Sequence, residues 1–305
     1  MEWNRPPDAE LLNRLTPAQG VIDMVLDTDA YNEVDDQFAL CYALLSPERL
    51  NVRAVYAAPF FNDRSSGPAD GMEKSYREIV RLLGKLGRKA DGFALKGSDA
   101  YLPDGQTPVD SPAARDLVKR ARGYSPQRPL TVVAIGAITN VASALLMAPD
   151  IARNISIVWL GGNPMGYPTA REFNLMQDVP AVRVLLDCCA PLTIIPCMGV
   201  SSHLLTTPAE LRAAIGGKNA VCDALVELFC AYQDDHFGWA KEIWDISTVA
   251  YLINPEWTPC AVLPSPLLTD DCHWAAGARR HPIKMAYFCY RNPIFRDLFE
   301  KLASA

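Results

Sequence analysis

Acidic side chains gather near the start of the chain, directly behind an apolar run. The stretch VLDTDAYNEVDDQFAL, residues 25–40, brings five carboxylates close together, namely those of Asp27, Asp29, Glu33, Asp35 and Asp36. Neighbouring carboxylates repel one another unless a positive group lies among them. A hard cation would resolve the conflict, because Ca²⁺ takes about six to eight oxygen ligands, often from carboxylates. The stretch therefore indicates a divalent cation site.

Helix capping is the simpler interpretation of part of this cluster. Acids in the first turn of a helix interact favourably with the helix dipole, and Asp35 and Asp36 need nothing more. Capping does not account for Asp27 and Asp29, which follow the apolar run. We interpret Asp27 itself as a side chain that orients the loop, because carboxylates outside a metal's ligand shell commonly bind ligands and loop amides.

The stretch shares parts of its pattern with two other acidic motifs. An EF-hand is excluded, because counting from Asp27 the sixth residue is Asn32 instead of Gly and the twelfth is Phe38 instead of Glu. A phosphatase of the haloacid dehalogenase type has Asp-x-Asp after its first strand, which would make Asp27 the nucleophile and Asp29 the acid/base. That alternative needs a later Lys and a paired Asp, and no apolar strand leads cleanly into TDDC at 269–272.

The elements that must position these acids alternate along the chain. Apolar runs predict strands at 21–27, 51–58, 130–136, 155–162 and 191–197. Helical spacing of apolar residues predicts helices at 33–45, 71–87, 139–149, 178–190, 208–216 and 219–238. This order predicts the α/β fold class, with an open, mainly parallel sheet and helices on both faces.

Parallel sheets place their sites at the carboxyl ends of the strands. The Asp-rich stretch, Asn62, Ile135 and the segment 161–163 all follow predicted strands. They should therefore meet at one edge of the sheet. Asn140 opens an apolar helix and is interpreted as a helix cap, since Asn is favoured there.

The bulk composition excludes some function classes. The chain has 305 residues and a formal net charge of -6, which disfavours nucleic acid as a partner. Nine cysteines without a CxxC pair predict reduced thiols, and no apolar run is long enough for a membrane span. We expect a cytoplasmic protein with an N-terminal extension at 1–20 and a single catalytic domain at 21–305.

Four further stretches accompany the Asp-rich loop in order. They are VVAIGAITNVASAL (132–145), IVWLGGN (157–163), EFNLMQDVPAVRVLL (172–186) and WDISTVAYLINPEW (244–257). Over residues 21–257 the chain resembles the inosine–uridine preferring nucleoside hydrolase family. The resemblance implies a Rossmann-like sheet that carries one Ca²⁺ and a hydrolase that splits ribonucleosides into free base and ribose. It also implies a homodimer or homotetramer.

The resemblance also implies roles for individual residues. Asp29 matches a Ca²⁺ ligand that activates a metal-held water as general base. The other implied Ca²⁺ ligands are Asp36, Asp245 and the main-chain carbonyl of Ile135. Side chains that match ribose-binding positions are Asp35, Asn62, Glu172 and Asn174. N-glycoside cleavage passes through an oxocarbenium-like sugar, so fixed acids around the ring suit this chemistry.

The chain departs from the family pattern in its first loop. Asp29 and Asp35 are separated by AYNEV, which makes the loop two residues longer than the common motif. The insertion carries Asn32 and Glu33. We expect Asn32 to contribute to substrate binding.

The second departure is at the residue before Asp245. Many members have His there to protonate the departing base, whereas this chain has Trp244, for which we expect stacking on the nucleobase. Tyr232 and His236, predicted on the helix 219–238, are the candidates for assisting the leaving group. The missing His also leaves open a relative that binds nucleosides without cleaving them.

Overall fold

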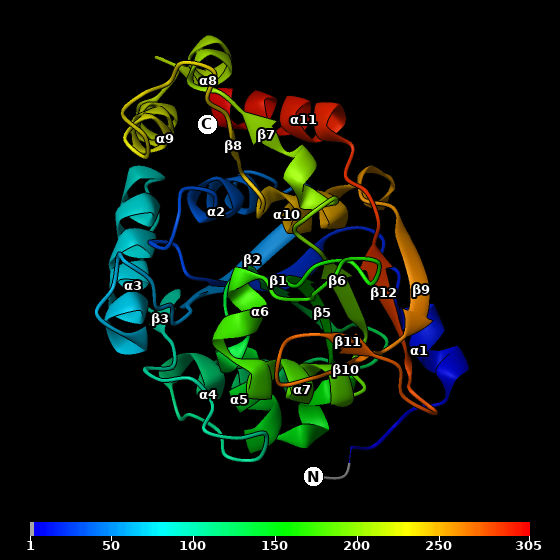
Figure 1. The fold of residues 1–305 in the computed structure, drawn as a ribbon. Coiled ribbons are helices and arrows are strands. Elements are labelled where there is room, and N and C mark those ends of the chain that lie inside the picture. Colours follow the sequence, from blue (N-terminus) through cyan, green and yellow to red (C-terminus); the bar gives the residue numbers. More distant parts are fainter. Residues whose placement is uncertain (1–2) are drawn as a thin grey trace.

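An eight-stranded sheet forms the centre of the computed structural model, which describes residues 3–305 (Figure 1). The strand order is β3-β2-β1-β4-β5-β6-β12-β9, and every pairing is parallel except the antiparallel pair β12 and β9. The strands are β1 (Ile22–Thr28), β2 (Leu50–Ala57), β3 (Ala94–Lys96), β4 (Leu130–Ala134), β5 (Ile155–Leu160), β6 (Leu192–Ile195), β9 (Cys260–Pro264) and β12 (Pro282–Ala286). Two small antiparallel sheets pair β7 (Leu205–Thr206) with β8 (Lys241–Glu242) and β10 (Leu267–Leu268) with β11 (Trp274–Ala275).

Helices cover both faces of the central sheet, which confirms the predicted fold class. Apolar residues of α4, α5 and α7 form one core with the sheet, and those of α2, α3 and α8 to α11 form the other. Figure 1 shows these two groups on opposite sides of the strands. The helices are α1 (Asp8–Arg14), α2 (Asp36–Leu44), α3 (Pro68–Lys85), α4 (Pro112–Ala121), α5 (Thr139–Met147), α6 (Phe173–Gln177), α7 (Val179–Asp187), α8 (Pro208–Ile215), α9 (Ala220–Cys230), α10 (Ile246–Ile253) and α11 (Arg291–Ala303).

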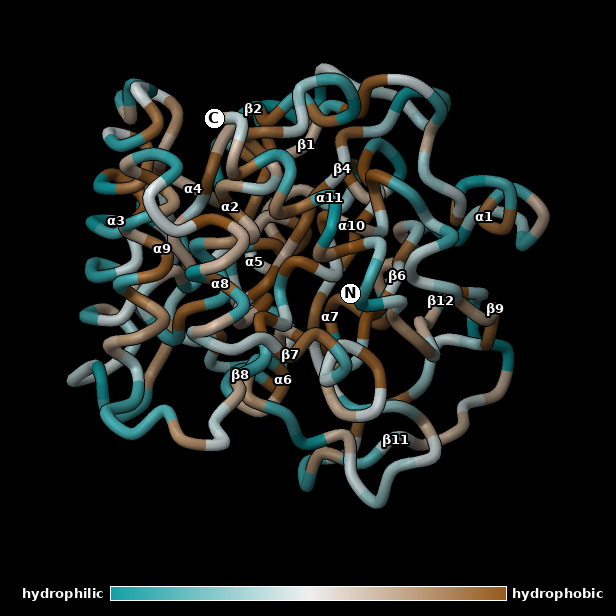
Figure 2. Tube along the Cα trace, turned by 90° about the horizontal axis from the view of Figure 1, so that it is seen from above, coloured by the Kyte–Doolittle hydropathy of each residue, from teal (hydrophilic) through white to brown (hydrophobic). Residues whose placement is uncertain are grey.

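The strand β1 shows why a continuous apolar run becomes a central parallel strand. Successive side chains of a strand point to opposite faces of the sheet. Val25 accordingly belongs to one core, whereas Met24 and Leu26 belong to the other. Figure 2 shows the same arrangement along the trace, with apolar segments inside and polar turns outside. Between Asp23 at its start and Asp27 near its carboxyl end, the strand has no polar position.

Helix α9 ends earlier than the sequence pattern predicts. It stops at Cys230, so the prediction of a helix over 219–238 is wrong for its last part. The residues that follow are mostly polar and exposed, and the backbone N–H of Phe237 bonds to Asp235 Oδ1 at 2.9 Å in a local turn. Without an apolar face to bury, that segment gains nothing from continuing the helix.

The segment predicted as an N-terminal extension packs against the domain. It contains α1, and Leu11 of that helix is completely buried. Over residues 3–305, no helix combines the length and the apolar character needed to cross a membrane.

Candidate active site

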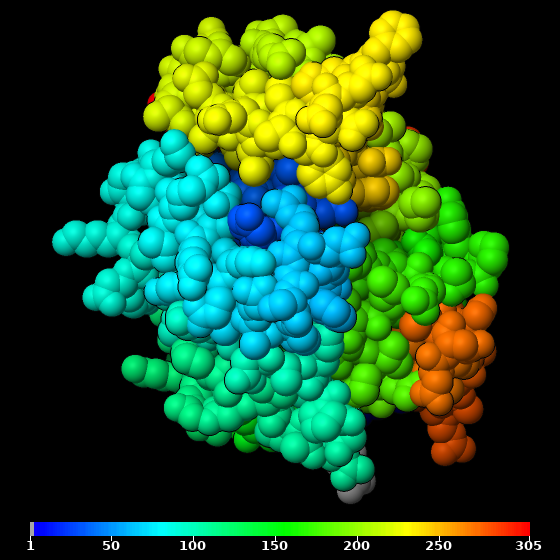
Figure 3. Space-filling view, turned by 60° about the vertical axis from the view of Figure 1, so that its left-hand side comes forward, coloured from blue at the N-terminus to red at the C-terminus, as the bar shows by residue number. Residues whose placement is uncertain are grey.

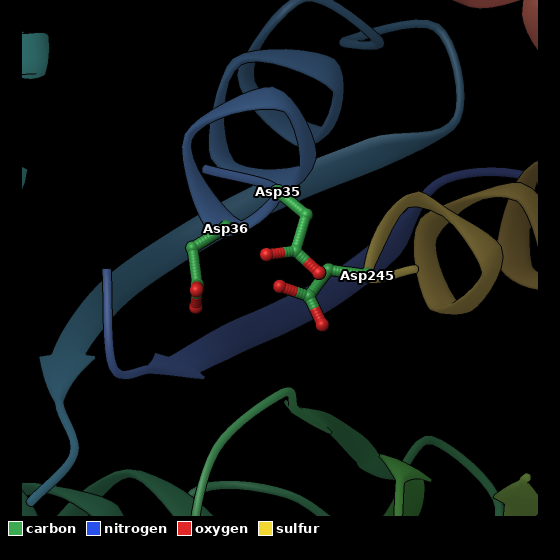
Figure 4. Close-up of side chains that lie close together, drawn as sticks. All are labelled: Asp35, Asp36 and Asp245. Carbon is green, nitrogen blue, oxygen red and sulfur yellow. The ribbon is translucent and has the colours of Figure 1, made fainter. Parts of the chain in front are cut away.

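Three acidic side chains from two distant parts of the sequence converge beyond the carboxyl ends of the strands. Asp35 directly precedes α2, Asp36 is the first residue of that helix, and Asp245 directly precedes α10. One carboxylate oxygen from each lies within 4.8 Å of the others, and all three residues are buried. Figure 4 shows their carboxylates close together beside the end of a strand. We call these three residues the acid group.

The starts of two helices account for the position of the acid group. Asp35 and Asp245 occupy N-cap positions, yet neither side chain accepts a capping hydrogen bond from its helix. The N-terminal ends of helices carry partial positive charge, which favours nearby carboxylates. Because neither side chain makes a capping hydrogen bond, the carboxylate oxygens of Asp35 and Asp245 remain available to a ligand.

Asp29 adds a fourth acid, immediately beyond β1. Neither of its carboxylate oxygens has a hydrogen-bond partner among the described residues, although both are buried. Burial raises the pKa of Asp29 well above its usual value, and the charges of Asp36 and Asp35 raise it further. A Cβ at Gly136 would lie 2.7 Å from Asp29 Oδ1, so residue 136 must lack a side chain for Asp29 to lie there.

The electrostatics of these acids suit a bound cation. Burial raises the pKa of Asp245 strongly, and Asp35 and Asp36 add to the rise through repulsion. Burial and the charge of Glu33 likewise raise the pKa of Asp35 to about 7, whereas Lys241 opposes the rise. Buried carboxylates without partners are costly, and an oxygen-rich group of this kind matches the ligands that Ca²⁺ prefers. The donor set and the unpartnered oxygens of Asp29 therefore fit the ion that the resemblance implies.

The other two implied ligands, Asp36 and Ile135, lie in the same place. The hydroxyl of Thr28 donates to Asp36 Oδ1 and fixes that carboxylate from the strand side. Ile135 follows β4, and its carbonyl oxygen accepts a hydrogen bond from Asn174 Nδ2 at 3.2 Å. A carbonyl oxygen has two lone pairs, so this bond leaves one acceptor direction at Ile135 for a ligand.

These groups line a pocket with a volume of about 330 Å³, which is the size of small-ligand sites. Figure 3 shows the early, dark-blue part of the chain recessed in a hollow between later segments. The lining residues are Asp29, Asn32, Glu33, Asp35, Asp36, Ile135, Leu160, Asn163, Arg171, Glu172, Phe173, Asn174, Cys197, Met198, Trp244 and Asp245.

A larger cavity, of about 860 Å³, lies at the opposite edge of the sheet, below the starts of the strands. Its lining includes Arg14, Asp23, Arg128 and Tyr251. Asp23 and Arg128 form an ion pair with each other at 3.0 Å. This cavity gathers no cluster of unpaired acids, so we place the site in the smaller pocket.

Glu172 and Asn174 are held rigidly at the pocket wall. Glu172 Oε2 accepts the backbone N–H of Gly162 at 2.8 Å, and Glu172 Oε1 accepts that of Asn174 at 2.9 Å. Burial raises the pKa of the Cys197 thiol, and the charge of Glu172 raises it further. Asn174 Nδ2 bonds to the carbonyls of Ile135 and Leu160. Glu172 thus caps the short helix α6 and fixes the position of Asn174.

Two of the three asparagines predicted to bind substrate contact each other. Asn62 Nδ2 donates to Asn32 Oδ1 at 2.6 Å. Asn32 lines the pocket, whereas Asn62 is not among the lining residues and its Oδ1 accepts the backbone N–H of Arg64. Asn32 therefore lies at the site, whereas Asn62 lies outside the pocket lining.

Of the three residues considered around the nucleobase, the structure brings only Trp244 to the pocket. Tyr232 and His236 lie in the loop after α9 rather than on the predicted helix, and neither is among the lining residues. His236 Nε2 is 3.0 Å from the carbonyl oxygen of Cys230, and its ring stacks on Trp239 with centroids 5.5 Å apart. The predicted role of Tyr232 and His236 with the leaving group stays a prediction.

Asp27 points away from the pocket. Asn140 Nδ2 donates to Asp27 Oδ1 at 2.7 Å, while Asn140 Oδ1 accepts from the backbone and hydroxyl of Ser98. Burial raises the pKa of Asp27 to about 7, although the bond from Asn140 opposes the rise. The prediction that Asn140 caps a helix is wrong, because its side chain makes no capping bond and instead joins β1 to the loop at Ser98. A carboxylate enclosed in this way is poorly placed as a phosphatase nucleophile.

Several lining residues carry no signal that sequence patterns could detect. Phe173, Cys197 and Met198 are ordinary apolar types, and only their position beside strand ends relates them to a site. Asn163 follows β5, as the strand-end rule predicts, and its Nδ2 binds the carbonyls of Thr169 and Arg171. Asn163 therefore shapes the loop that carries the pocket wall.

Comparison with known proteins identifies the family. The family model described as inosine-uridine preferring nucleoside hydrolase matches residues 64–284. The pyrimidine-specific ribonucleoside hydrolase RihA of Citrobacter koseri is 29% identical over 252 residues, covering 73% of this chain and 77% of that protein. The RihA of Klebsiella pneumoniae is 29% identical over 263 residues, covering 77% and 80%.

Solved structures share the fold over nearly the whole chain. A plant nucleoside hydrolase superposes with a TM-score of 0.74 at 20% identity, covering 93% of this chain and 99% of its own. A purine-preferring ribonucleoside hydrolase from Gardnerella vaginalis gives the same TM-score at 19% identity, covering 92% and 98%. These two likenesses bear on the fold alone.

The family match and the curated relatives identify an N-glycosyl hydrolase of the ribonucleoside hydrolase class. The chain belongs to the inosine-uridine preferring nucleoside hydrolase family. The matched residues include Glu172, Asn174 and Asp245, whereas the first loop with Asp29 lies outside them.

Proposed function

We propose that this enzyme hydrolyses the N-glycosidic bond of ribonucleosides in a Ca²⁺-dependent reaction, with Asp29 as general base. The ion would be held by Asp29, Asp36, Asp245 and the carbonyl oxygen of Ile135. The observation that carries the proposal is Asp29, which is buried beside the acid group with both carboxylate oxygens unpartnered. Burying such a side chain without hydrogen-bond partners destabilises the fold, and a bound ligand would supply the missing partners.

The bound ion would offset the repulsion among the carboxylates and lower the pKa of a neighbouring water. Asp29, which lies beside the acid group with both carboxylate oxygens unpartnered, then accepts a proton from the attacking water.

The ribose would be held by the polar wall of the pocket. Asp35 accepts a hydrogen bond from a ribose hydroxyl, and Glu172 and Asn174 approach the sugar from the opposite loop. The bonds that fix Glu172 and Asn174 support this role, because catalysis requires the sugar carbon to be held against the water. Negative charge around the ring stabilises the oxocarbenium-like transition state.

The nucleobase would lie against the less polar part of the pocket. Trp244 and Phe173 line the pocket and supply aromatic surface for stacking. An indole cannot donate an acid proton at neutral pH, so Trp244 does not replace the His that many members have at this position. Proton transfer to the departing base by Tyr232 or His236 would require the loop after α9 to approach the pocket.

A panel of nucleosides tests this proposal directly. Cytidine, uridine, adenosine, inosine and their 2′-deoxy counterparts are incubated with the enzyme and Ca²⁺, and free base and sugar are separated by chromatography. The pyrimidine-specific relatives make cytidine and uridine the first substrates to assay. We expect base release from ribonucleosides and much slower release from deoxynucleosides, because the 2′-hydroxyl contact is lost. Failure to release base from any ribonucleoside would refute the proposal.

A further inference from the structure

A partly buried ion pair connects the long first loop to a distant strand. Lys241 of β8 forms a salt bridge through its Nζ with Glu33 Oε2, and Glu33 belongs to the insertion between Asp29 and Asp35. Lys241 is only 8% exposed, and its ammonium also lies 4.5 Å from the ring centroid of Tyr232. Lysines are rarely this buried unless they are paired. The pairing therefore fixes the position of Glu33.

Glu33 lies nearer the opening of the pocket than the other acids do. Its side chain is 33% exposed, whereas Asp29, Asp35 and Asp36 are each exposed by 4% or less. Glu33 nevertheless lines the same pocket. Among the described residues only Oε2 of its carboxylate has a partner, so Oε1 is available to a ligand. Glu33 thus lies between the acidic floor and the opening.

We propose that Glu33, positioned by Lys241, is a specificity residue that accepts a hydrogen bond from the nucleobase and selects bases that carry an amino group. This inference rests on the proposed function, because it assumes that the ribose occupies the acidic floor. With the sugar held there, the base is the part of the substrate that extends toward the opening. The expected preference is for cytidine over uridine and for adenosine over inosine.

The chemistry of an ionised carboxylate gives the direction of the preference. It accepts hydrogen bonds and donates none. The amino groups of cytosine and adenine donate to it, and such charge-assisted bonds are stronger than neutral ones. Uracil and hypoxanthine present a keto oxygen at the same position, whose lone pairs would face the negative charge. Specific binding sites commonly combine an attraction to the preferred ligand with a repulsion of its competitor.

Lys241 acts through Glu33 and is a positioning residue. Its ammonium holds one carboxylate oxygen, which orients the other. Removing the ammonium would leave Glu33 free to change rotamer and would leave its charge partly buried and unpaired. Arginine at position 241 retains the charge and can still reach a carboxylate.

The decisive measurement is the ratio of kcat/KM for cytidine to that for uridine, together with the adenosine to inosine ratio. It is made on the wild type and on Glu33→Gln, Lys241→Met and Lys241→Arg. A p-nitrophenyl riboside, which has no nucleobase, reports the ribose machinery separately. We expect amino bases to be preferred in the wild type and the ratio to fall at least about tenfold in Glu33→Gln, the cost of one bond to a charged group. Lys241→Met should lower the ratio as well, and Lys241→Arg should largely retain it.

Equilibrium binding provides a second measurement that needs no turnover. Calorimetry on the Asp29→Asn variant compares the Kd of cytidine and uridine with and without Glu33→Gln. A wild-type preference for keto bases, or equal ratios in the wild type and Glu33→Gln, would overturn the inference. Binding that selects cytidine in a protein inert toward every riboside would support the role of Glu33 and refute the proposed hydrolysis.

Discussion

Strand β1 has an aspartate at its start and another just beyond its end, and among the described residues only the first has hydrogen-bond partners for its carboxylate. At its start, Asp23 accepts hydrogen bonds from Asn51 Nδ2 at 2.6 Å and Tyr124 at 3.1 Å, and it pairs with Arg128 at 3.0 Å. Just beyond its end, Asp29 is buried with both carboxylate oxygens unpartnered. Donors and a cation satisfy the carboxylate of Asp23, whereas no group among residues 3–305 satisfies that of Asp29.

The contrast separates acids that stabilise the fold from acids that serve a reaction. A carboxylate whose partners are all protein groups is complete without a ligand. Asp29 remains incomplete, and the pKa values of Asp29 and Asp245 are raised because burial and mutual repulsion disfavour the charged forms. Unsatisfied, perturbed acids in a pocket are the expected signature of a functional site.

Replacing the acid at each end of β1 tests the contrast most strongly. Asp29→Asn should lower kcat about a thousandfold, because the amide cannot accept the proton of the attacking water. Asp23→Asn should retain activity and lose about 1 kcal/mol of unfolding free energy, the usual scale of a partly exposed hydrogen-bonded ion pair. Steady-state kinetics and chemical denaturation measure the two effects. Near-normal turnover in Asp29→Asn would remove its assignment as the base.

A smaller effect is expected from a change that only shifts Asp29. Gly136→Ala would place a Cβ 2.7 Å from Asp29 Oδ1 and push the carboxylate aside, so kcat should fall about ten- to a hundredfold. Gly84→Ala is the matched control, because a Cβ there meets nothing within 4 Å on α3. The control should retain full activity and gain about 0.5–1 kcal/mol of stability from the lower entropy of its unfolded chain. Equal activities in the two variants would contradict the crowding of Asp29 by position 136.

His281 is a buried ionisable residue outside the pocket, so we expect it to affect stability and not the reaction. Burial lowers the pKa of His281 to about 4, and the charges of Arg280 and Arg5 contribute to this. Because the unfolded chain binds a proton below about pH 6.5, stability should be lost as the pH falls from there through pH 4. His281→Gln should remove about 2 kcal/mol of that loss at pH 5. Denaturation curves of both proteins at pH 7 and pH 5 measure it, and identical pH dependence in the two would rule out this role.

Five strands of the central sheet, β1, β2, β4, β5 and β6, could be predicted because apolar runs have few alternatives in a soluble chain. The runs at β1, β4, β5 and β6 are largely buried and consist mainly of apolar residues, so their few polar positions, such as Asp23, Thr131 and Thr193, do not obscure the pattern. The strand-end rule then brought the first loop and Ile135 to one edge. The order of the strands and the antiparallel β9 depend on packing between distant segments, which no local pattern encodes.

Side-chain partners were predicted less well, because they depend on tertiary contacts. The type and position of Asn140 suggest a helix cap, yet its amide joins Asp27 to Ser98. The apolar spacing of α9 continues into a polar segment, and only the structure shows that the helix ends at Cys230 and that His236 lies outside the pocket lining. The ion pair of Glu33 with Lys241 links residues that are far apart in the chain, so sequence patterns did not reveal it.

The account depends most on the claim that Asp29 and the acid group beyond β1 bind a divalent cation. Thermal unfolding of the wild type and Asp245→Asn, each with and without Ca²⁺, tests it most directly. The account predicts that Ca²⁺ raises the Tm of the wild type, by the equivalent of about 2.7 kcal/mol at a hundred times its Kd. It also predicts that Asp245→Asn shows little Ca²⁺ response and, without Ca²⁺, melts above the wild type because one repelling charge is gone. A wild-type Tm that does not change with Ca²⁺ would contradict the account.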